Sequence, residues 1–507
     1  MRTRPRDAGR WVAWLILALC LTAAVLLRGG VDAVQWQYLS VVISLATAAC
    51  LLLRSRTDAG SASPLGVLTA GLRRERVKSS SVKTTAPRSA ANEAAVQARR
   101  ASPELWLLSA VAAWMLLALV PLPPSMVSLL SPQGARWTMA ARALTGVDRS
   151  AWLPLSVAPP ATFERLVFVL PAMAMFLAAR EMARWWTGKR VWIAVAPVIV
   201  VAVLEASLGL AQFNSAADGS SVARAVSGTY VNRNHYAGLL ELAFPIALTW
   251  ALAVWTQSDG TSQGRNRYAR RGTRTRPLGL ALGAGALVFT AGGLLAGVIA
   301  SLSRMGFLAT LAAIATVALG WLLLRRKERR SSAWMWGLPF VLPLAIVLLV
   351  STNAMVLRFV DTPGAGDITT DGRVQIWREG WQLFRAYPLT GAGLGTFEHA
   401  LYPFRHAMPT NAVEYAHNDY LQILTELGTV GFGLTMAFAL WIFRRSLGAA
   451  FREEAQHPWL GMGLLASLLA IGLHSLVDFN LYIPANALAL AWLAGVAVSP
   501  ALQQADS

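Results

Sequence analysis

The chain has 507 residues, of which 55% are hydrophobic and only 14% are charged. Soluble domains carry about 25% charged residues, so this composition lies outside the range of ordinary soluble proteins. Apolar runs of roughly 17 to 24 residues recur from one end of the chain to the other, which is the length that a helix needs to cross a bilayer. The sequence therefore predicts a polytopic membrane protein and excludes a string of soluble domains, a disordered chain and a disulfide scaffold.

The net charge of +19 raises the question of a nucleic-acid partner. Most Lys and Arg residues, however, stand in clusters that fall on one side of the membrane when the apolar runs are counted as spans. This is the positive-inside pattern, in which basic loops stay in the cytoplasm. The charge therefore encodes topology, and no nucleic-acid partner is expected. The clusters are residues 1–10, 54–104, 180–190, 257–277, 325–330 and 444–458.

Taken in chain order, the apolar runs predict an all-α protein with about twelve transmembrane helices and both termini in the cytoplasm. The stretch from Pro277 to Leu324 is too long for one span and breaks most naturally at Ser301, Ser303 and Arg304, with a tight external turn. The predicted spans are about 11–27, 37–53, 105–121, 161–179, 191–211, 235–256, 278–300, 305–324, 334–351, 421–443, 459–477 and 482–498.

These spans divide the chain into five regions. A flexible basic cytoplasmic linker is expected at 54–104, and a large periplasmic loop at 352–420 that carries the catalytic residues. Within that loop, apolar residues at helical spacing predict a short amphipathic helix over Val374 to Phe384. The glycines of Gly391 to Gly395 favour a turn that allows close packing. The regions are 1–53 with the first two spans, 54–104, 105–351 with spans three to nine, 352–420, and 421–507 with the last three spans and a cytoplasmic tail.

Polar motifs gather on the outer side of this predicted topology. Charged residues close to hydrocarbon are costly and usually functional. Several arginines without a carboxylate cluster indicate an anionic ligand, because guanidinium groups match phosphate oxygens bidentately. His417, flanked by Asn418 and Asp419, is the natural candidate for a general base near neutral pH. The motifs are Ser227–Gly238, Ser301–Gly306, Asp371–Arg378, Tyr415–Gln422 and His474–Asp478.

Each of these residues also has a purely structural interpretation. Arg304 is compatible with a side chain that snorkels at a helix end, and Arg373 or Arg378 with a solvated helix face. His474 rivals His417 as the base, since Asp478 lies one helical turn away and is placed to orient its ring. No histidine or carboxylate spacing fits a metal site, so neither a metal nor a cofactor is expected.

At these same residues the chain resembles the O-antigen ligase and polymerase superfamily. The matching motifs run in order over residues 228–484, about half of the chain. They are Gly228-Thr-Tyr-Val-Asn-Arg-Asn-His-Tyr-Ala-Gly238, Ser303-Arg-Met-Gly306, Asp371-Gly-Arg-x-x-x-Trp377, Pro388-Leu-Thr-Gly-x-Gly-x-Gly-x-Phe397, Ala416-His-Asn-Asp-Tyr-Leu-Gln422 with Glu426 and Gly428, and His474-Ser-x-x-Asp478.

The resemblance implies a GT-C-type helical bundle with its active site at the periplasmic face of the bacterial inner membrane. Arg304 and Arg373 would hold a pyrophosphate, and His417 would deprotonate the acceptor hydroxyl, without a metal and with inversion at the sugar carbon. Arg233 departs from the family pattern, where many members carry Pro, so it either adds a phosphate contact or positions its turn. The residues expected to bind substrate around His417 are Arg304, Arg373, Arg233, Arg378, Asn418, Asp419 and His474.

The first hypothesis is therefore a ligase that transfers a glycan from undecaprenyl pyrophosphate to lipid A-core. A polymerase that uses a second lipid-linked glycan as acceptor is the chemically adjacent alternative, and protein O-glycosylation is a third choice of acceptor. A non-enzymatic transporter of lipid-linked glycans is a further alternative, although transporters are expected to place polar residues in the middle of their spans. The sequence does not separate ligase from polymerase.

Overall fold

The computed structural model describes a helical protein in which short turns connect most helices. Among the described residues, extended backbone pairing is limited to an isolated bridge between Leu122 and Leu153. The described residues are 5–61, 102–146, 152–186, 188–215, 225–260, 278–325, 370–406, 412–453 and 455–503.

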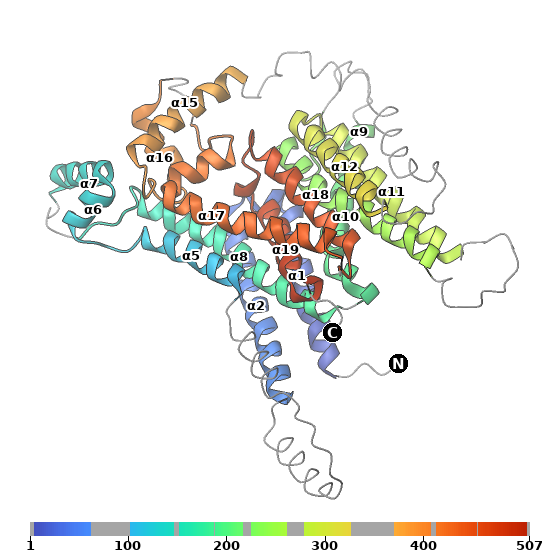
Figure 1. Ribbon diagram of the computed structural model, residues 1–507. Coiled ribbons are helices and arrows are strands. Elements are labelled where there is room, and N and C mark those ends of the chain that lie inside the picture. The colour runs from blue at the N-terminus through green and yellow to red at the C-terminus, as the bar shows by residue number, and fades with distance from the viewer. Residues whose placement is uncertain are drawn as a thin grey trace, which may run out of the picture.

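The α-helices of these segments are given with the labels of Figure 1. They are α1 (Pro5–Leu26), α2 (Ala33–Ser61), α5 (Pro103–Leu117), α6 (Pro124–Leu130), α7 (Pro132–Thr145), α8 (Pro159–Met182), α9 (Ala196–Ser215), α10 (Arg233–Gly260), α11 (Leu278–Ala300), α12 (Arg304–Arg325), α15 (Thr370–Ala386), α16 (Phe397–Leu401), α17 (Asp419–Phe451), α18 (Pro458–His474), α19 (Pro484–Val498) and α20 (Pro500–Gln503). Short 3₁₀ turns are η1 (Arg28–Gly30), η2 (Ala183–Trp185), η3 (Gly188–Ala194), η5 (Tyr402–Phe404) and η6 (Asn480–Tyr482).

Within the described residues, seven helices are long and apolar enough to cross a membrane, or up to eight if η3 and α9, bent by 47°, form one span. The shorter apolar helices α5, α18 and α19 coincide with three further predicted spans. The predicted span 334–351 lies outside the described residues. An all-helical, multi-pass membrane protein is therefore confirmed, while the count of about twelve spans and the periplasmic position of the loop stay predictions.

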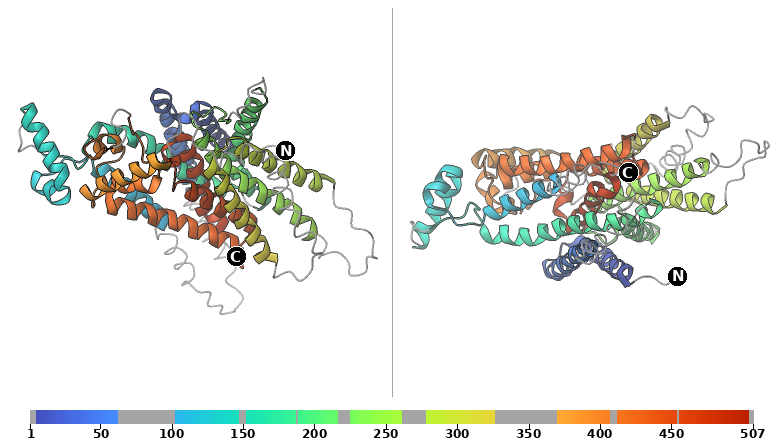
Figure 2. Two further views of the ribbon diagram at one scale, coloured as in Figure 1. Left: turned by 90° about the horizontal axis from the view of Figure 1, so that it is seen from above. Right: turned by 60° about the horizontal axis from the view of Figure 1, so that its bottom comes forward.

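Helix α10 forms the centre of the bundle and is buried over most of its length. It packs against α9, α11, α12, α18 and α19, while α8 packs against α2 and α19, and α17 packs against α5 and α18. Figures 1 and 2 show α15 and α16 gathered at one end of α17, and α6 and α7 projecting beyond the bundle. The loop helices therefore cap one end of the bundle.

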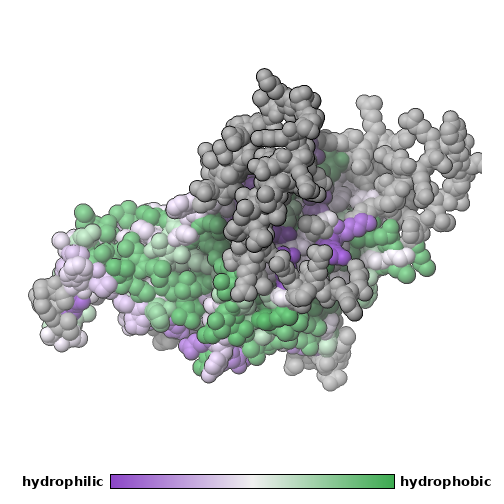
Figure 3. Space-filling view, turned by 90° about the horizontal axis from the view of Figure 1, so that it is seen from below, coloured by the Kyte–Doolittle hydropathy of each residue, from purple (hydrophilic) through white to green (hydrophobic). Residues whose placement is uncertain are grey.

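The outside of the bundle is apolar over broad areas, as Figure 3 shows for one face. Large side chains such as Leu45, Phe163 and Phe289 are exposed on helices that pass the membrane-span test. Soluble monomers rarely expose contiguous apolar patches larger than a few hundred Å². Burying these side chains in lipid removes the cost of exposing them to water, so the surface fits a bilayer.

A buried ion pair ties together three helices at the end of α8 that lies away from α15. Both Nε and Nη2 of Arg180 donate to Glu104 Oε1, at 3.1 and 2.8 Å, and Trp441 Nε1 donates to Glu104 Oε2 at 3.2 Å. Arg180 and Glu104 neutralise each other's charge in a region of low dielectric constant, where a single unpaired charge is strongly destabilising. The pair fixes α5, α8 and α17 relative to one another.

Three expectations about local structure can be compared directly with the helices. Helix α15 confirms the amphipathic helix predicted over Val374 to Phe384, and the tight turn before Arg304 is confirmed because α11 ends at Ala300. The boundary of the predicted linker 54–104 was wrong at its start, because α2 continues through residues 54–61. Residues 62–101 of that linker lie outside the described segments.

The glycine-rich turn at 390–395 confirms the prediction of close packing. It passes backbone to backbone against a break in α17 at Gly428, and the amide of Ala392 donates to the carbonyl of Thr425 at 2.9 Å. Both Gly391 (φ 71°) and Gly428 (φ 65°) adopt left-handed backbone conformations, which favour glycine. This seam attaches the outer loop to the start of α17.

Replacing Gly428 by alanine should destabilise the protein by about 1–3 kcal/mol, because the new Cβ would meet the backbone carbonyl of Leu389 in a left-handed conformation. The measurement is the thermal unfolding midpoint of the detergent-solubilised protein. It is determined by size-exclusion chromatography of samples that have been heated to a series of temperatures.

Gly433→Ala is the matched control, since Gly433 lies in the same helix and a Cβ there meets nothing within 4 Å. Alanine is the better helix former, so this variant should be neutral or slightly more stable. Equal midpoints for the two variants would contradict the role assigned to the seam.

Candidate functional site

Four of the five polar motifs meet at the connection between α18 and α19 (residues 475–483), and the fifth, Ser301–Gly306, packs against the start of α10. Asp478 Oδ1 lies 3.3 Å from Nε2 of His235, which comes from the first turn of α10. Arg373 Nη1, from the start of α15, donates to the carbonyl of Val477 at 3.1 Å. Segments more than 100 residues apart in sequence therefore meet at this connection.

The segment that carries His417 is held by the same neighbours. Trp377 Nε1 on α15 donates to the carbonyl of Ala416 at 2.9 Å, and Ser475 Oγ donates to Asp419 Oδ2 at 2.7 Å. These bonds fix the backbone on both sides of His417. The histidine is thereby placed at the start of α17, between the loop helix α15 and the α18–α19 connection.

His417 has an unusual backbone conformation, with φ at 48°. Left-handed backbone in a non-glycine residue is uncommon and clusters at functional sites, where the surrounding structure maintains it. Its ring is half-buried and meets Phe479 edge-on, with 4.8 Å between centroids. Its Nδ1 is buried and has no hydrogen-bond partner among the described residues.

The burial of His417 favours a neutral imidazole. Burial is the largest effect and lowers the pKa of His417 to about 4. The Asp478 carboxylate opposes this shift, whereas the nearby Arg373 and His235 reinforce it. For Asp478 itself, burial raises the pKa, but its contact with His235 outweighs burial and holds the pKa well below the usual range. At neutral pH the site therefore combines an uncharged imidazole with a carboxylate.

Asn418 and Asp419 position the helix and make no hydrogen bond to the His417 ring. Asn418 Oδ1 accepts from the amide of Leu421 at 3.0 Å, which is an N-cap bond. Asp419 is fully buried, and its Oδ2 also accepts from the amide of Leu481 at 3.2 Å. The two side chains that flank His417 in the sequence therefore fix the backbone on its C-terminal side and make no hydrogen bond to its ring.

His474, the rival base, is completely enclosed. Its Nδ1 lies 3.0 Å from both carboxylate oxygens of Glu241 on α10, whereas its Nε2 is 3.9 Å from Asp478 Oδ2. The expectation that Asp478 orients His474 was wrong, because Glu241 is the closer carboxylate and Asp478 faces His235. Since His474 has no exposed surface, its ring is placed to join α10 to α18 rather than to meet a substrate.

Two of the predicted arginines are the first residues of neighbouring helices. Arg233 begins α10 and Arg304 begins α12, and both side chains are half-buried. The two helix starts approach closely, because a Cβ at Gly306 would lie 2.7 Å from the Cβ of Ala237. Helix N-termini carry partial positive charge, so these arginines add to a field that already favours anions.

Arg378 is not brought into this group. It is exposed on α15, five positions after Arg373, which turns it to a different side of the helix. The structure therefore gives its predicted role in substrate binding no support.

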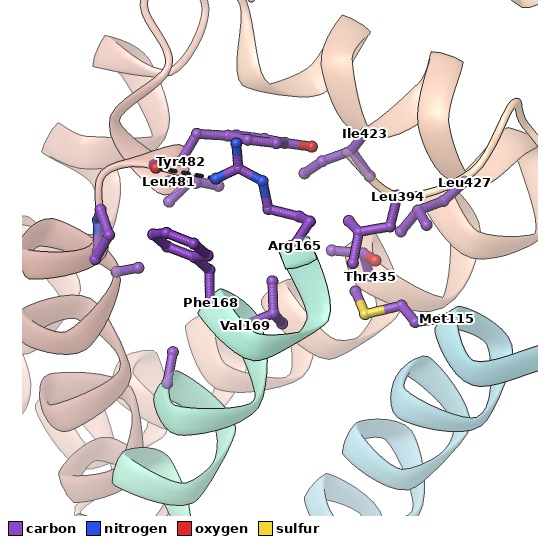
Figure 4. A pocket seen from close by; sticks show the side chains of 13 residues that line it. Met115, Arg165, Phe168, Val169, Leu394, Ile423, Leu427, Thr435, Leu481 and Tyr482 are labelled. Carbon is purple, nitrogen blue, oxygen red and sulfur yellow. Dashed lines mark hydrogen bonds between the residues drawn. The ribbon is translucent and has the colours of Figure 1, made fainter. Parts of the chain in front are cut away.

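Arg165 was missed by the sequence analysis. It lies on α8, half-buried, and its Nη2 donates to the hydroxyl of Tyr415 at 3.1 Å. Its guanidinium also lies 5.0 Å from the ring centroid of Tyr482, and Figure 4 shows it bonded to the Tyr482 carbonyl. A charged residue inside the predicted span 161–179 was the available signal, since ionisable groups within spans are usually functional.

No group of three or more His, Cys, Asp or Glu side chains that is placed to hold a metal ion occurs in the segments described above. The arrangement instead combines a neutral imidazole, several guanidinium groups and two adjoining helix starts. Chemically, it can bind a phosphate-containing anion and accept a proton beside it.

Comparison with known proteins supports the family suggested by the motifs. Residues 286–436 match the model of the O-antigen ligase family. Among curated proteins, no relative matches the chain. The matched segment contains Arg304, Arg373 and His417. This segment of the chain is thus similar to the O-antigen ligase family, and the match supports the resemblance to the O-antigen ligase and polymerase superfamily.

Proposed function

We propose that the protein is a glycosyltransferase of the ligase type, which transfers a glycan from undecaprenyl pyrophosphate to a hydroxyl of lipid A-core at the periplasmic face of the inner membrane. The observation that carries this proposal is the position of His417, held in a left-handed conformation beside Arg373. The family match supports a ligase or polymerase activity in general.

The donor pyrophosphate would bind where Arg233 and Arg304 begin α10 and α12, with Arg373 on its other side. The Nη1 atom of Arg373 is occupied by the Val477 carbonyl, while its Nε is buried without a partner among the described residues. An unpartnered, buried N–H beside a neutral histidine is costly unless a ligand satisfies it. An anionic donor oxygen would supply that acceptor.

The reaction would proceed by direct displacement at the anomeric carbon of the donor. His417 takes the proton of the acceptor hydroxyl while that oxygen forms a bond to the anomeric carbon. The bond between this carbon and the phosphate oxygen breaks on the opposite face, so that the configuration inverts. The leaving undecaprenyl pyrophosphate retains the bonding electrons, and the arginines stabilise its growing negative charge.

The first prediction concerns topology. In a variant whose native cysteines Cys20 and Cys50 are replaced by alanine, Tyr402→Cys should react with a membrane-impermeant maleimide in spheroplasts, because η5 belongs to the proposed periplasmic loop. Glu453→Cys, in the connection between α17 and α18, should react only after permeabilisation. Labelling of Glu453→Cys but not Tyr402→Cys in intact spheroplasts would reverse the proposed orientation.

The second prediction concerns the phosphate clamp. Replacing Arg304 or Arg373 by alanine should reduce transfer by about 10- to 100-fold or more, since one charge-assisted contact contributes about 1.5–3 kcal/mol. Lysine should restore little activity, because its point charge lacks the bidentate geometry. The measurement is the transfer rate with purified lipid-linked donor.

Arg385→Ala is the matched control for the arginines. Arg385 is exposed in the last turn of α15, so its loss should leave transfer within about twofold of the wild type. Full activity in Arg304→Ala would show that Arg304 only anchors its helix.

The third prediction concerns the base and its pH dependence. A positioned base contributes about 10²- to 10⁴-fold, so His417→Ala should lose that factor while it retains donor binding. Because the pKa of His417 is lowered to about 4, the imidazole stays neutral on acidification until the pH approaches that value. The kcat/KM of the wild type should therefore remain constant from about pH 8 to pH 6 and fall only below about pH 5.

His474→Gln serves as the comparison for the base, since His474 faces Glu241 and not the open part of the site. Its effect should appear in thermal stability, with the pH profile of the remaining activity unchanged. An acidic limb centred near pH 6.5, or normal turnover in His417→Ala, would refute the assignment.

A further inference from the structure

A glutamate is completely buried inside α9, a helix that the proposed reaction does not use. Glu205 has no exposed surface and lies near the middle of this helix, within the predicted span 191–211. Helix α9 packs against α10 and α11 (Figure 1). Ionisable groups within spans are costly and usually functional, so Glu205 is a candidate functional residue outside the site described above.

Both carboxyl oxygens of Glu205 contact Thr229, in the turn that precedes α10. The amide of Thr229 donates to Oε2 at 2.9 Å, and the Thr229 hydroxyl lies 2.7 Å from Oε1. Gly228 allows this approach, because its φ is 56° and a Cβ there would overlap Oε2 of Glu205. The irregular backbone before α10 thereby finds inside the bundle a hydrogen-bond partner that water would otherwise supply.

A second side chain of α9 holds the same turn. Gln212 follows Glu205 by about two helical turns, so both side chains lie on one face of α9. Its Oε1 accepts from the amides of Ser227 and Gly228, at 3.3 and 3.0 Å, and its Nε2 donates to the Gly228 carbonyl at 2.6 Å. Two side chains of α9 therefore bond the backbone of three consecutive residues, 227–229.

Helix α19 holds the other end of this turn. The Tyr230 hydroxyl donates to Oδ1 of Asn486 at 2.8 Å, and Nδ2 of Asn486 donates to the carbonyl of His235 at 2.9 Å. Arg233 lies between Tyr230 and His235 in the chain and is the first residue of α10. The backbone on both sides of Arg233 is therefore held by side chains from two other helices, α9 and α19.

The hydrogen bonds around Glu205 fit an uncharged carboxylic acid. The Thr229 hydroxyl has one proton but two neighbouring oxygens, Oε1 of Glu205 and the Val25 carbonyl, which is 3.0 Å away. A protonated Glu205 supplies the missing donor, because its own O–H would bond Thr229 and leave the Thr229 proton for Val25. Burying an uncharged acid also costs far less than burying a carboxylate.

We propose that Glu205 and Gln212 are positioning residues for the donor pyrophosphate, which act through the turn 227–232 to place the Arg233 guanidinium. Glu205 fixes the turn by hydrogen bonds and not by charge, and the turn sets the position of the first residue of α10. Since Glu205 is fully enclosed, it would touch no substrate itself. This inference rests on the proposed function, because that proposal assigns the donor pyrophosphate to Arg233, Arg304 and Arg373.

The test is equilibrium binding of radiolabelled undecaprenyl pyrophosphate to the purified full-length protein in lipid nanodiscs. Glu205→Ala should weaken this binding about 10-fold or more, as expected when one charge-assisted contact is lost. Affinity for undecaprenol, which has the same chain without phosphates, should stay within about twofold, because the residues proposed to be displaced contact only the phosphates. Equal losses for both lipids would show a general structural defect and overturn the proposal.

Glu205→Gln separates hydrogen bonding from charge. It should bind undecaprenyl pyrophosphate within about twofold of the wild type, because an amide of the same shape donates to the Thr229 hydroxyl and accepts from the Thr229 amide. Ser207→Ala is the matched control on α9, since the exposed Ser207 hydroxyl bonds the Val203 carbonyl of its own helix. A loss in Glu205→Gln as large as that in Glu205→Ala would overturn the proposal, because the charge would then be required.

A double-variant cycle tests whether Glu205 acts through Arg233. Because Arg233→Ala removes the group that is to be placed, adding Glu205→Ala should weaken binding of undecaprenyl pyrophosphate by no more than about twofold further. Fully additive losses would overturn the proposal. Gln212→Ala is the milder variant if Glu205→Ala does not fold, and it should weaken binding about 2- to 10-fold, the effect of a neutral hydrogen bond. Wild-type affinity in Gln212→Ala would contradict its role.

The two proposals fail in different ways. If the wild type binds undecaprenyl pyrophosphate but transfers glycan to no acceptor, the proposed enzymatic function is wrong, while the binding measurements still test Glu205 and Gln212. If transfer occurs but Glu205→Ala and Gln212→Ala bind the lipid like the wild type, the enzyme assignment stands and the positioning role is wrong. A wild type that does not bind undecaprenyl pyrophosphate would overturn both.

Discussion

Polar side chains that are buried in the protein must find partners, because an unsatisfied polar group removed from water costs several kcal/mol. In this protein the connection between α18 and α19 supplies many of those partners. The Val477 carbonyl accepts a hydrogen bond from Arg373, and the Asp478 carboxylate faces His235. The Phe479 ring packs edge-to-face against the His417 ring. The remainder of the site depends on this short segment, which joins the loop helix α15 to the core helix α10.

A second constraint keeps the segment that carries α15 and α16 in a fixed position on the bundle. The glycine seam between residues 390–395 and α17 brings two backbones together so closely that side chains cannot intervene. Such packing limits motion at the start of α17, where His417 adopts its strained conformation. A residue held in this way would be preorganised for proton transfer, as the proposed role of His417 requires.

Charged side chains are distributed asymmetrically between the starts of α10 and α12 and the start of α8. On the α10 and α12 side, arginines and helix starts create a field that favours anions. On the α8 side, carboxylates surround a single arginine at the end of an apolar groove.

The sequence by itself determined the helical, membrane-spanning architecture, because apolar runs of sufficient length have one stable form in a bilayer. It also led to the proposal of Arg304, Arg373 and His417 as site residues, since charged residues close to hydrocarbon are costly and usually functional. It did not reveal that Glu241 holds His474, that Asp478 faces His235, or that Arg165 stands between a groove and a polar cavity. Those relations join residues far apart in the chain, and they depend on how the helices rotate and pack. Only the tertiary structure decided them, because helical periodicity gives the face of each residue but not the neighbour that the face meets.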